Sequence, residues 1–290
     1  MALPLWVDFF EDLQRVRGRS RNTVMAYRRD LELYDEFKSK DWDVSRIFEF
    51  MNTKGLSVRS QARVISSIRT YLKFIQSRGL EAPELRQLRP PKVKASLPKV
   101  LTDDDFKKLY EACDVGDASR TARNKITLLM LFGLGCRVSE MIQLNLQDFN
   151  EQESWVKIIG KGNKERLVPV TERLRNELKS YIVNFRGPLL RSKTDSILIN
   201  DRGKRPSRVD LWRWLAAWSE KAGFDHTIGP HQFRHGCATA LLESGADLRS
   251  IQMLLGHSSI QTTQIYTTVS SKKLQDTVLE HHPLSDKDLD

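Results

Sequence analysis

The sequence predicts a mainly α-helical protein of two domains: an N-terminal helical bundle, and a larger C-terminal domain that is mostly helical and holds a small antiparallel β-sheet. Apolar residues recur at helical spacing over most of the chain. Three prolines interrupt this pattern within residues 88–98. Two short β-branched runs flank the turn GKGNKE in the second half of the chain. We therefore expect domains at residues 1–87 and 99–290, joined by a linker at residues 88–98.

The N-terminal domain is expected to contain three amphipathic helices. The apolar residues that share one face of the first, at residues 5–16, are Leu5, Phe9, Leu13 and Val16. Residues 22–37 and residues 57–79 repeat this spacing, and Gly79 is expected to end the last helix.

The other face of the helix at residues 57–79 is a candidate DNA-binding surface. It carries Arg59, Arg63, Arg69 and Lys73. Residues 1–98 hold 19 Lys or Arg and 12 Asp or Glu, so they contribute a net +7 to the formal charge of +10. A cationic surface favours polyanions, most often nucleic acid. The alternative is a helix face that is merely solvated.

The C-terminal domain is expected to open with a capped helix, with Thr102 or Asp103 as the N-cap residue. The runs on either side of GKGNKE predict two strands, and SILIN at residues 196–200 predicts a third. Helical spacing resumes at residues 208–223 and residues 233–245.

The composition favours the cytoplasm. The three cysteines are far apart, which is typical of a reducing compartment and not of a disulfide framework. The first residues lack the pattern of a signal peptide, and no apolar run is long enough to cross a membrane.

Four short motifs in the C-terminal domain hold residues that can do chemistry. They are Arg137 and Glu140 in RVSE, Lys161 in IIGKGNKER, His231 and Arg234 in HQFR, and His257 and Tyr266 in LLGHSSIQTTQIY. Each alone has an ordinary interpretation: a surface ion pair, a solvated turn lysine, a helix cap, or a packed tyrosine. Two histidines of HQFRH are four residues apart, but no carboxylate or cysteine cluster lies nearby, so no metal site is expected.

Taken together, these residues suit displacement at a phosphodiester. The transition state spreads negative charge over oxygens that the planar forks of the two arginines match. The histidines can donate to the same oxygens or assist proton transfer. Lys161 can protonate the leaving oxygen, and Tyr266 can attack phosphorus to form a covalent phosphotyrosine. Protein cations would replace a metal ion, so no cofactor is expected.

This ordered set resembles the tyrosine recombinase, or phage integrase, family. The runs IIGKGNKERLVPV, HQFRH and GADLRSIQMLLGHSSIQTTQIYTTV are especially similar to its Xer branch, and the resemblance covers nearly the whole chain. The run GADLR…QMLLGH and the later HHP lean towards the XerD type. One departure is LGCR where the family usually has TGLR, and Leu134 and Cys136 are expected to pack there.

The resemblance implies partners and residue roles. A SAM-like N-terminal domain and the catalytic domain would clamp double-stranded DNA at a dif-like site. Tyr266 would form a 3′-phosphotyrosyl link, with the two arginines and two histidines holding the phosphate, Lys161 as general acid and Glu140 in support. Four protomers, with a second Xer recombinase or as a homotetramer, would resolve chromosome dimers through a Holliday junction, with an FtsK-type DNA translocase as partner. The C-terminal tail would dock on a neighbouring protomer.

Other functions with this pattern are a DNA-binding protein of the same fold that does not cut, a type IB topoisomerase, and the integrase of a mobile element. A pure binder has no need of Tyr266 or Lys161. The topoisomerase would relax plasmids without needing two sites.

Overall fold

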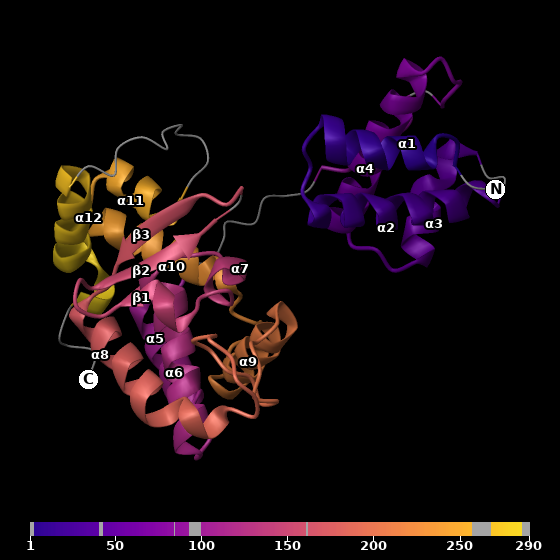
Figure 1. Ribbon diagram of the computed structural model, residues 1–290. Coiled ribbons are helices and arrows are strands. Elements are labelled where there is room, and N and C mark those ends of the chain that lie inside the picture. Colours follow the sequence, from indigo (N-terminus) through magenta and orange to yellow (C-terminus); the bar gives the residue numbers. More distant parts are fainter. Residues whose placement is uncertain are drawn as a thin grey trace. The chain divides into compact units, whose positions relative to one another are not determined.

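The computed structural model describes residues 3–40, 43–83, 85–92, 100–160, 162–256 and 268–285, the side chains of residues 268–273 excepted. The chain divides into two compact units, Met1–Leu97 and Pro98–Asp290 (Figure 1). The boundary falls inside the predicted linker. Each unit has its own hydrophobic core.

The regular elements in the described part of the N-terminal unit are all helical. Its elements are α1 (Trp6–Glu11), the π-helical segment η1 (Asp12–Val16), α2 (Arg21–Lys38), η2 (Val44–Arg46), α3 (Ile47–Thr53) and α4 (Val58–Ser77). The two long helices begin at serine caps, because Ser20 and Ser57 each accept a backbone N–H three residues on. Gly79 follows α4 with a φ of 79°, in the left-handed region that commonly ends helices.

One predicted core position of the first helix is wrong. Val16 is 78% exposed, although Phe9 and Leu13 are buried. In η1 the Arg17 N–H bonds the Asp12 carbonyl five residues back, so the helix is wider there than an α-helix. The wider turn rotates Val16 away from the face that Phe9 and Leu13 share.

A buried carboxylate joins α2 to α4. Asp30 is 2% exposed and accepts hydrogen bonds from Arg63 Nη1 at 2.5 Å and Ser67 Oγ at 2.7 Å. Since a buried charge is costly without partners, these bonds fix how the two helices face each other.

The C-terminal unit packs its helices around α6. Its α-helices are α5 (Asp103–Ala112), α6 (Ala118–Gly133), α7 (Val138–Met141), α8 (Glu172–Ser180), α9 (Arg208–Lys221), α10 (Pro230–Glu243), α11 (Leu248–Leu255) and α12 (Thr268–His281). Shorter helical segments are η3 (Leu146–Asp148), η4 (Tyr181–Phe185), η5 (Gly187–Leu189) and η6 (Pro283–Ser285). Residues 128–131 of α6 are fully buried, as expected of a central helix. Thr102 caps α5 in a capping box with Asp105, which confirms the first of the two predicted caps.

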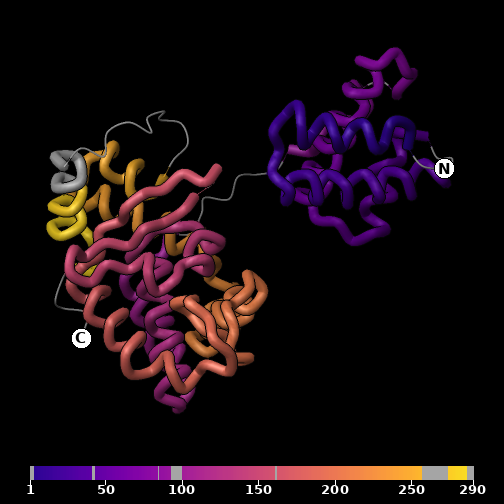
Figure 2. Tube along the Cα trace, viewed as in Figure 1, coloured from indigo at the N-terminus to yellow at the C-terminus, as the bar shows by residue number. Residues whose placement is uncertain are grey.

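The antiparallel sheet of the described C-terminal residues has strands β1 (Phe149–Asn150), β2 (Trp155–Ile159) and β3 (Glu165–Pro169), in that order. Val156 pairs with Val168, and Ile158 pairs with Arg166. Gly162 and Asn163 both have positive φ, the conformation that tight hairpin turns require. Figure 2 shows β2 and β3 running together as a hairpin.

The third strand predicted at residues 196–200 is wrong. Ile197, Leu198 and Ile199 are buried, but this segment bonds residues 144–146 and does not join the sheet. Periodicity alone does not separate a buried extended segment from a buried strand. The outer strand is instead the short β1.

The last described residues, 274–285, pack on their own unit. Leu274, Val278, His282 and Leu284 are buried, and α12 lies beside α11 (Figure 1). The segment η6 contacts α8 and α10. Docking of this tail on a neighbouring protomer stays a prediction.

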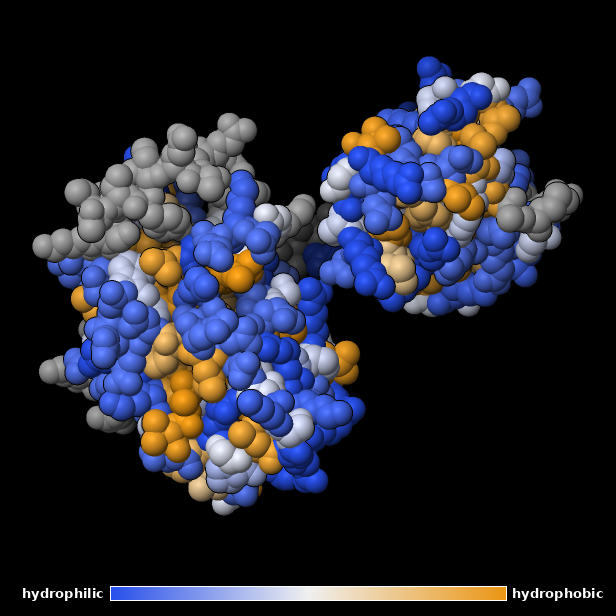
Figure 3. All heavy atoms as spheres, in the orientation of Figure 1, coloured by the Kyte–Doolittle hydropathy of each residue, from blue (hydrophilic) through white to orange (hydrophobic). Residues whose placement is uncertain are grey.

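The predicted fold class is confirmed: the described chain is mainly α-helical with one small antiparallel sheet. On the face shown in Figure 3, hydrophilic residues cover most of each unit, and smaller hydrophobic patches lie among these hydrophilic residues. No helix within the described ranges combines the length and apolarity needed to cross a membrane.

Candidate active site

The first part of the candidate site is the start of α7. Arg137 is the N-cap residue, and Glu140 lies one turn into the helix. Glu140 accepts the Arg137 backbone N–H at 3.0 Å and Arg137 Nη1 at 3.0 Å. The Arg137 side chain is still 41% exposed, so one edge of its guanidinium is held while another part faces solvent.

The same carboxylate forms a buried ion pair with β3. Arg166 Nη2 donates to Glu140 Oε2 at 2.7 Å, and both residues are almost fully buried. Arg166 Nε also donates to the Leu254 carbonyl of α11 at 3.1 Å. A charge-assisted pair of this kind is stronger than a neutral hydrogen bond.

The second part of the site is the N-terminal part of α10. Arg234 Nη1 donates to the Gly135 carbonyl at 2.7 Å, and Nη2 donates to the Leu255 carbonyl at 2.8 Å. These bonds bring α10 to the loop before Arg137 and to the last turn of α11. Gly135 has a φ of 52°, which strains residues with a Cβ, and a Cβ there would also lie 2.8 Å from the Leu255 side chain, so glycine suits this close approach.

His231 lies one turn before Arg234 on α10 and is exposed. The helix entry is fixed by Gly229, whose N–H donates to Gln232 Oε1 at 2.8 Å, and by Pro230 at the first helical position. The predicted i, i+3 spacing is therefore confirmed as helical.

The electrostatics of these residues are coupled. Burial acts to raise the pKa of Glu140, but the bonds and charge of Arg166, together with the bonds from Arg137, hold it below its ordinary value. Burial and the charge of Arg137 lower the pKa of Arg234, which still stays cationic. The described cluster therefore holds three guanidinium groups around one carboxylate, a net charge of +2.

Three predicted residues, Lys161, His257 and Tyr266, lie outside the described residues. The described residues that directly precede Lys161 and His257 lie against the cluster. A Cβ at Gly160 would lie 3.4 Å from both Arg166 Nη1 and Glu140 Oε1. A Cβ at Gly256 would lie 3.1 Å from Arg166 Cζ.

Arg166 is not among the residues predicted from the sequence. The signal was present, because β3 alternates and Arg166 shares the inward face with Val168 and Val170. A charged residue at an inward position needs a partner.

The candidate DNA-binding residues of α4 differ from one another in their contacts. Arg63 is paired with Asp30, and Arg69 donates to the carbonyls of Leu85 and Leu88. Arg59 and Lys73 are exposed, and within the described chain no ion pair involves either. Of the four, Arg59 and Lys73 are thus best placed to meet an external anion.

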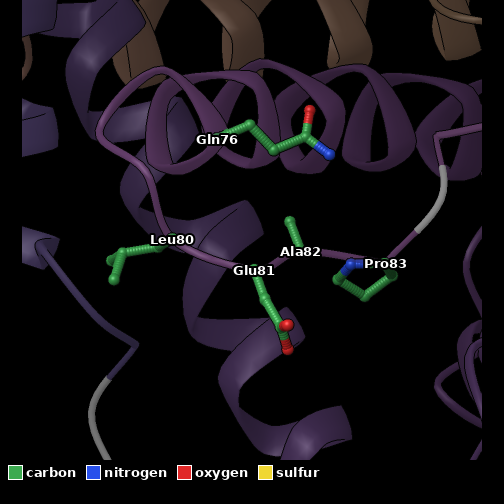
Figure 4. Close-up of a pocket in the computed structure, with 5 residues that line it drawn as sticks. All are labelled: Gln76, Leu80, Glu81, Ala82 and Pro83. Atoms are coloured by element: carbon green, nitrogen blue, oxygen red, sulfur yellow. The ribbon is translucent and has the colours of Figure 1, made fainter.

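The N-terminal unit has an open pocket that contains none of the candidate site residues. It is lined by Gln76, Leu80, Glu81, Ala82 and Pro83 at the end of α4 (Figure 4). Its single ionisable group is a carboxylate, which does not suit a phosphate. Elsewhere in the described chain, no group of three or more His, Cys, Asp or Glu side chains forms a metal-binding cluster.

Comparison with known proteins decides the family. The model for the phage integrase family matches residues 99–273, and the model for the phage integrase N-terminal SAM-like domain matches residues 7–79. The chain belongs to the phage integrase family. The expected resemblance to this family is confirmed, and the chain is a tyrosine site-specific recombinase.

Curated relatives in this family are similar over almost their whole length. Tyrosine recombinase XerD of Oceanobacillus iheyensis is 37% identical over 95% of this chain and 97% of the relative. Tyrosine recombinase XerD of Shewanella oneidensis is 34% identical over 97% of each chain.

Solved structures agree on the fold. The crystal structure of XerA recombinase is 27% identical, covers 94% of both chains and has a TM-score of 0.50. The XerH site-specific recombinase bound to palindromic difH substrate in a post-cleavage complex is 24% identical, covers 91% of this chain and 81% of that chain, and has a TM-score of 0.66.

Proposed function

We propose that this recombinase cleaves and rejoins DNA at a specific site through a covalent bond between Tyr266 and a 3′-phosphate. The observation that carries the proposal is the joint placement of Arg137 and Arg234. Each is anchored on one side, Arg137 by Glu140 and Arg234 by two backbone carbonyls. Their charges are close enough for Arg137 to lower the pKa of Arg234, so a bound phosphate would relieve their repulsion.

The chemistry follows from this anion site. The Tyr266 oxygen attacks phosphorus, the Tyr–phosphate bond forms, and the bond to the 5′-oxygen breaks. Lys161 gives a proton to that oxygen, and the exposed imidazole of His231 is available for the phenolic proton. The guanidinium donors stabilise the charge on the nonbridging oxygens, together with His257, and one such donor is worth about 10²–10³ in rate. Attack by a free 5′-hydroxyl reverses the steps and seals the strand.

The substrate is double-stranded DNA with a dif-like site. XerH, a similar structure by fold, is described as bound to difH substrate. Arg59 and Lys73, which are exposed on α4 of the N-terminal domain, would bind phosphates of the DNA backbone. The domains would then be a DNA clamp at residues 1–87, a linker at 88–98 and a catalytic domain at 99–290.

The cellular role is the resolution of chromosome dimers in the cytoplasm. The relatives named Tyrosine recombinase XerD favour this assignment. We propose a tetramer with a second Xer recombinase, exchange through a Holliday junction, and activation by an FtsK-type translocase. The tail beyond Tyr266 would dock on a neighbouring protomer in that assembly.

Covalent trapping tests the proposal. The full chain is mixed with a nicked suicide duplex that carries a dif-like site, with the second Xer recombinase present, and products are separated in detergent. We expect a protein–DNA band with the wild type and none with Tyr266→Phe. Binding in a gel shift without any covalent band would instead identify a protein of this fold that does not cut.

A further inference from the structure

Arg166 joins three segments of the active site without being one of its predicted members. Its backbone belongs to β3, its Nη2 donates to Glu140 of α7 at 2.7 Å, and its Nε donates to Leu254 of α11 at 3.1 Å. The side chain is 7% exposed, so it is closed off from a bound DNA strand.

Both acceptors of Arg166 lead directly to an anion-binding arginine. Glu140 is the carboxylate that holds Arg137 by its backbone N–H and by Nη1. Leu254 is joined by one peptide bond to Leu255, whose carbonyl anchors Arg234. Arg166 is therefore linked to Arg137 through Glu140, and to Arg234 through the Leu254–Leu255 peptide.

The surrounding backbone leaves Arg166 little freedom. A Cβ at Gly256 would lie 3.1 Å from its Cζ, and a Cβ at Gly160 would lie 3.4 Å from its Nη1. The glycine at position 256 lets its backbone come close to the guanidinium group, and the backbone at Gly160 lies near the same group. A planar fork with donors in fixed directions suits two acceptors on separate elements, whereas a lysine ammonium is a point charge.

We propose that Arg166 is a positioning residue that sets the directions of Arg137 and Arg234 and thereby the rate of DNA cleavage. It acts through Glu140 and the Leu254–Leu255 peptide and does not touch DNA. The inference rests on the proposed function, because the rate in question is that of covalent attachment to DNA.

Arg166→Lys is the informative variant. It keeps a cation beside Glu140 but cannot reproduce the fork. Arg175→Lys is the matched control, since Arg175 lies in the same unit and its partners are Ser154, just before β2, and Glu172, at the start of α8. Each full-length variant is measured for affinity to the duplex, for the single-turnover rate of covalent trapping, and for its melting temperature.

We expect Arg166→Lys to bind the duplex like the wild type and to trap about 10²-fold more slowly, because small misplacements of reacting groups cost about that factor. Arg175→Lys should trap at the wild-type rate. A substrate with a 5′-bridging phosphorothiolate needs no proton on its leaving group, so it should leave the Arg166→Lys deficit in place. Its full rescue would overturn the proposal, because Arg166 would then act through the proton donor and not through the two arginines.

The remaining outcomes separate the two proposals. No covalent product with the wild type defeats the proposed function itself. The positioning role is overturned if the wild type forms covalent product and Arg166→Lys forms it equally fast. It is also overturned if Arg166→Lys is slower only in proportion to its weaker binding of the duplex. Should Arg166→Lys melt far below the wild type, the double variant Glu140→Gln, Arg166→Met removes both charges together. The same loss of rate is expected there, and a normal rate would contradict the inference.

Discussion

The ion pair beneath the active site predicts a large and specific loss of stability in Glu140→Gln. Glu140 accepts three hydrogen bonds, two from Arg137 and one from Arg166, and is 6% exposed. Glutamine keeps the shape but removes the charge and turns an N–H₂ group towards the arginine donors. Arg166 then becomes a buried cation without a counter-ion.

Breaking one side of a buried pair costs about 3–5 kcal/mol. In a unit of this size each kcal/mol lowers the melting temperature by roughly 2–4 °C, so the expected fall is roughly 6–20 °C. Thermal unfolding of the full chain, followed by circular dichroism, measures it. Glu172→Gln is the control, because that side chain is 74% exposed and its ion pair with Arg175 is long, at 3.6 Å. Its effect should stay within about 0.5 kcal/mol.

The sign of the pH dependence provides a second check. The pKa of Glu140 is held below its ordinary value of 4.5 in the folded chain, so its contribution is fully present above that value. It is lost as the pH falls through the lower, folded pKa. The stability difference between the wild type and Glu140→Gln should therefore shrink in acid. A Glu140→Gln protein as stable as the wild type at pH 7 would refute the reasoning.

Three further predictions concern other parts of the chain. The double variant Arg59→Ala, Lys73→Ala should weaken DNA binding and reduce the slope of log affinity against log salt by about 2, because each lost phosphate contact removes about one unit. Arg69→Ala is the control: it removes bonds to backbone carbonyls, so it should lower stability and leave the slope unchanged. Gly256→Ala should cost roughly 1–2 kcal/mol in a urea titration, because the residue has a φ of 66° and its new methyl group would press on the Arg166 guanidinium. Burial lowers the pKa of His282 to about 4, and its Nδ1 accepts the Leu284 N–H. As the pH falls, the His282 imidazole is therefore protonated at a higher pH in the unfolded chain than in the folded chain. Stability should fall by about 3 kcal/mol as the pH drops from roughly 6.5 to 4, and His282→Gln should flatten that part of the curve.

The sequence was sufficient wherever a local signal agreed with the tertiary structure. The threonine cap of α5 and the glycine after α4 are local chemistry, and the structure uses both as predicted. The i, i+3 relation of His231 and Arg234 needs only a helix, which the surrounding apolar spacing indicates.

It was insufficient where the backbone departs from regular geometry or where residues far apart in the chain meet. Val16 is exposed because a π-helical turn changes the period. Residues 196–200 are buried like a strand yet pair with a loop. The contact of Arg166 with Leu254 spans 88 positions, and no local pattern reports it.

The anchoring of Arg234 has a thermodynamic consequence. A guanidinium has five N–H donors, and two of them are already committed to the carbonyls of Gly135 and Leu255. A freely rotating arginine loses up to about 2 kcal/mol of conformational entropy when it is immobilised. Here that loss is incurred during folding, so an arriving phosphate meets a preorganised donor group and the remaining N–H groups can bind it without further ordering. In the proposed phosphate site, the carbonyls of Gly135 and Leu255 would thus contribute to affinity although neither would touch the phosphate.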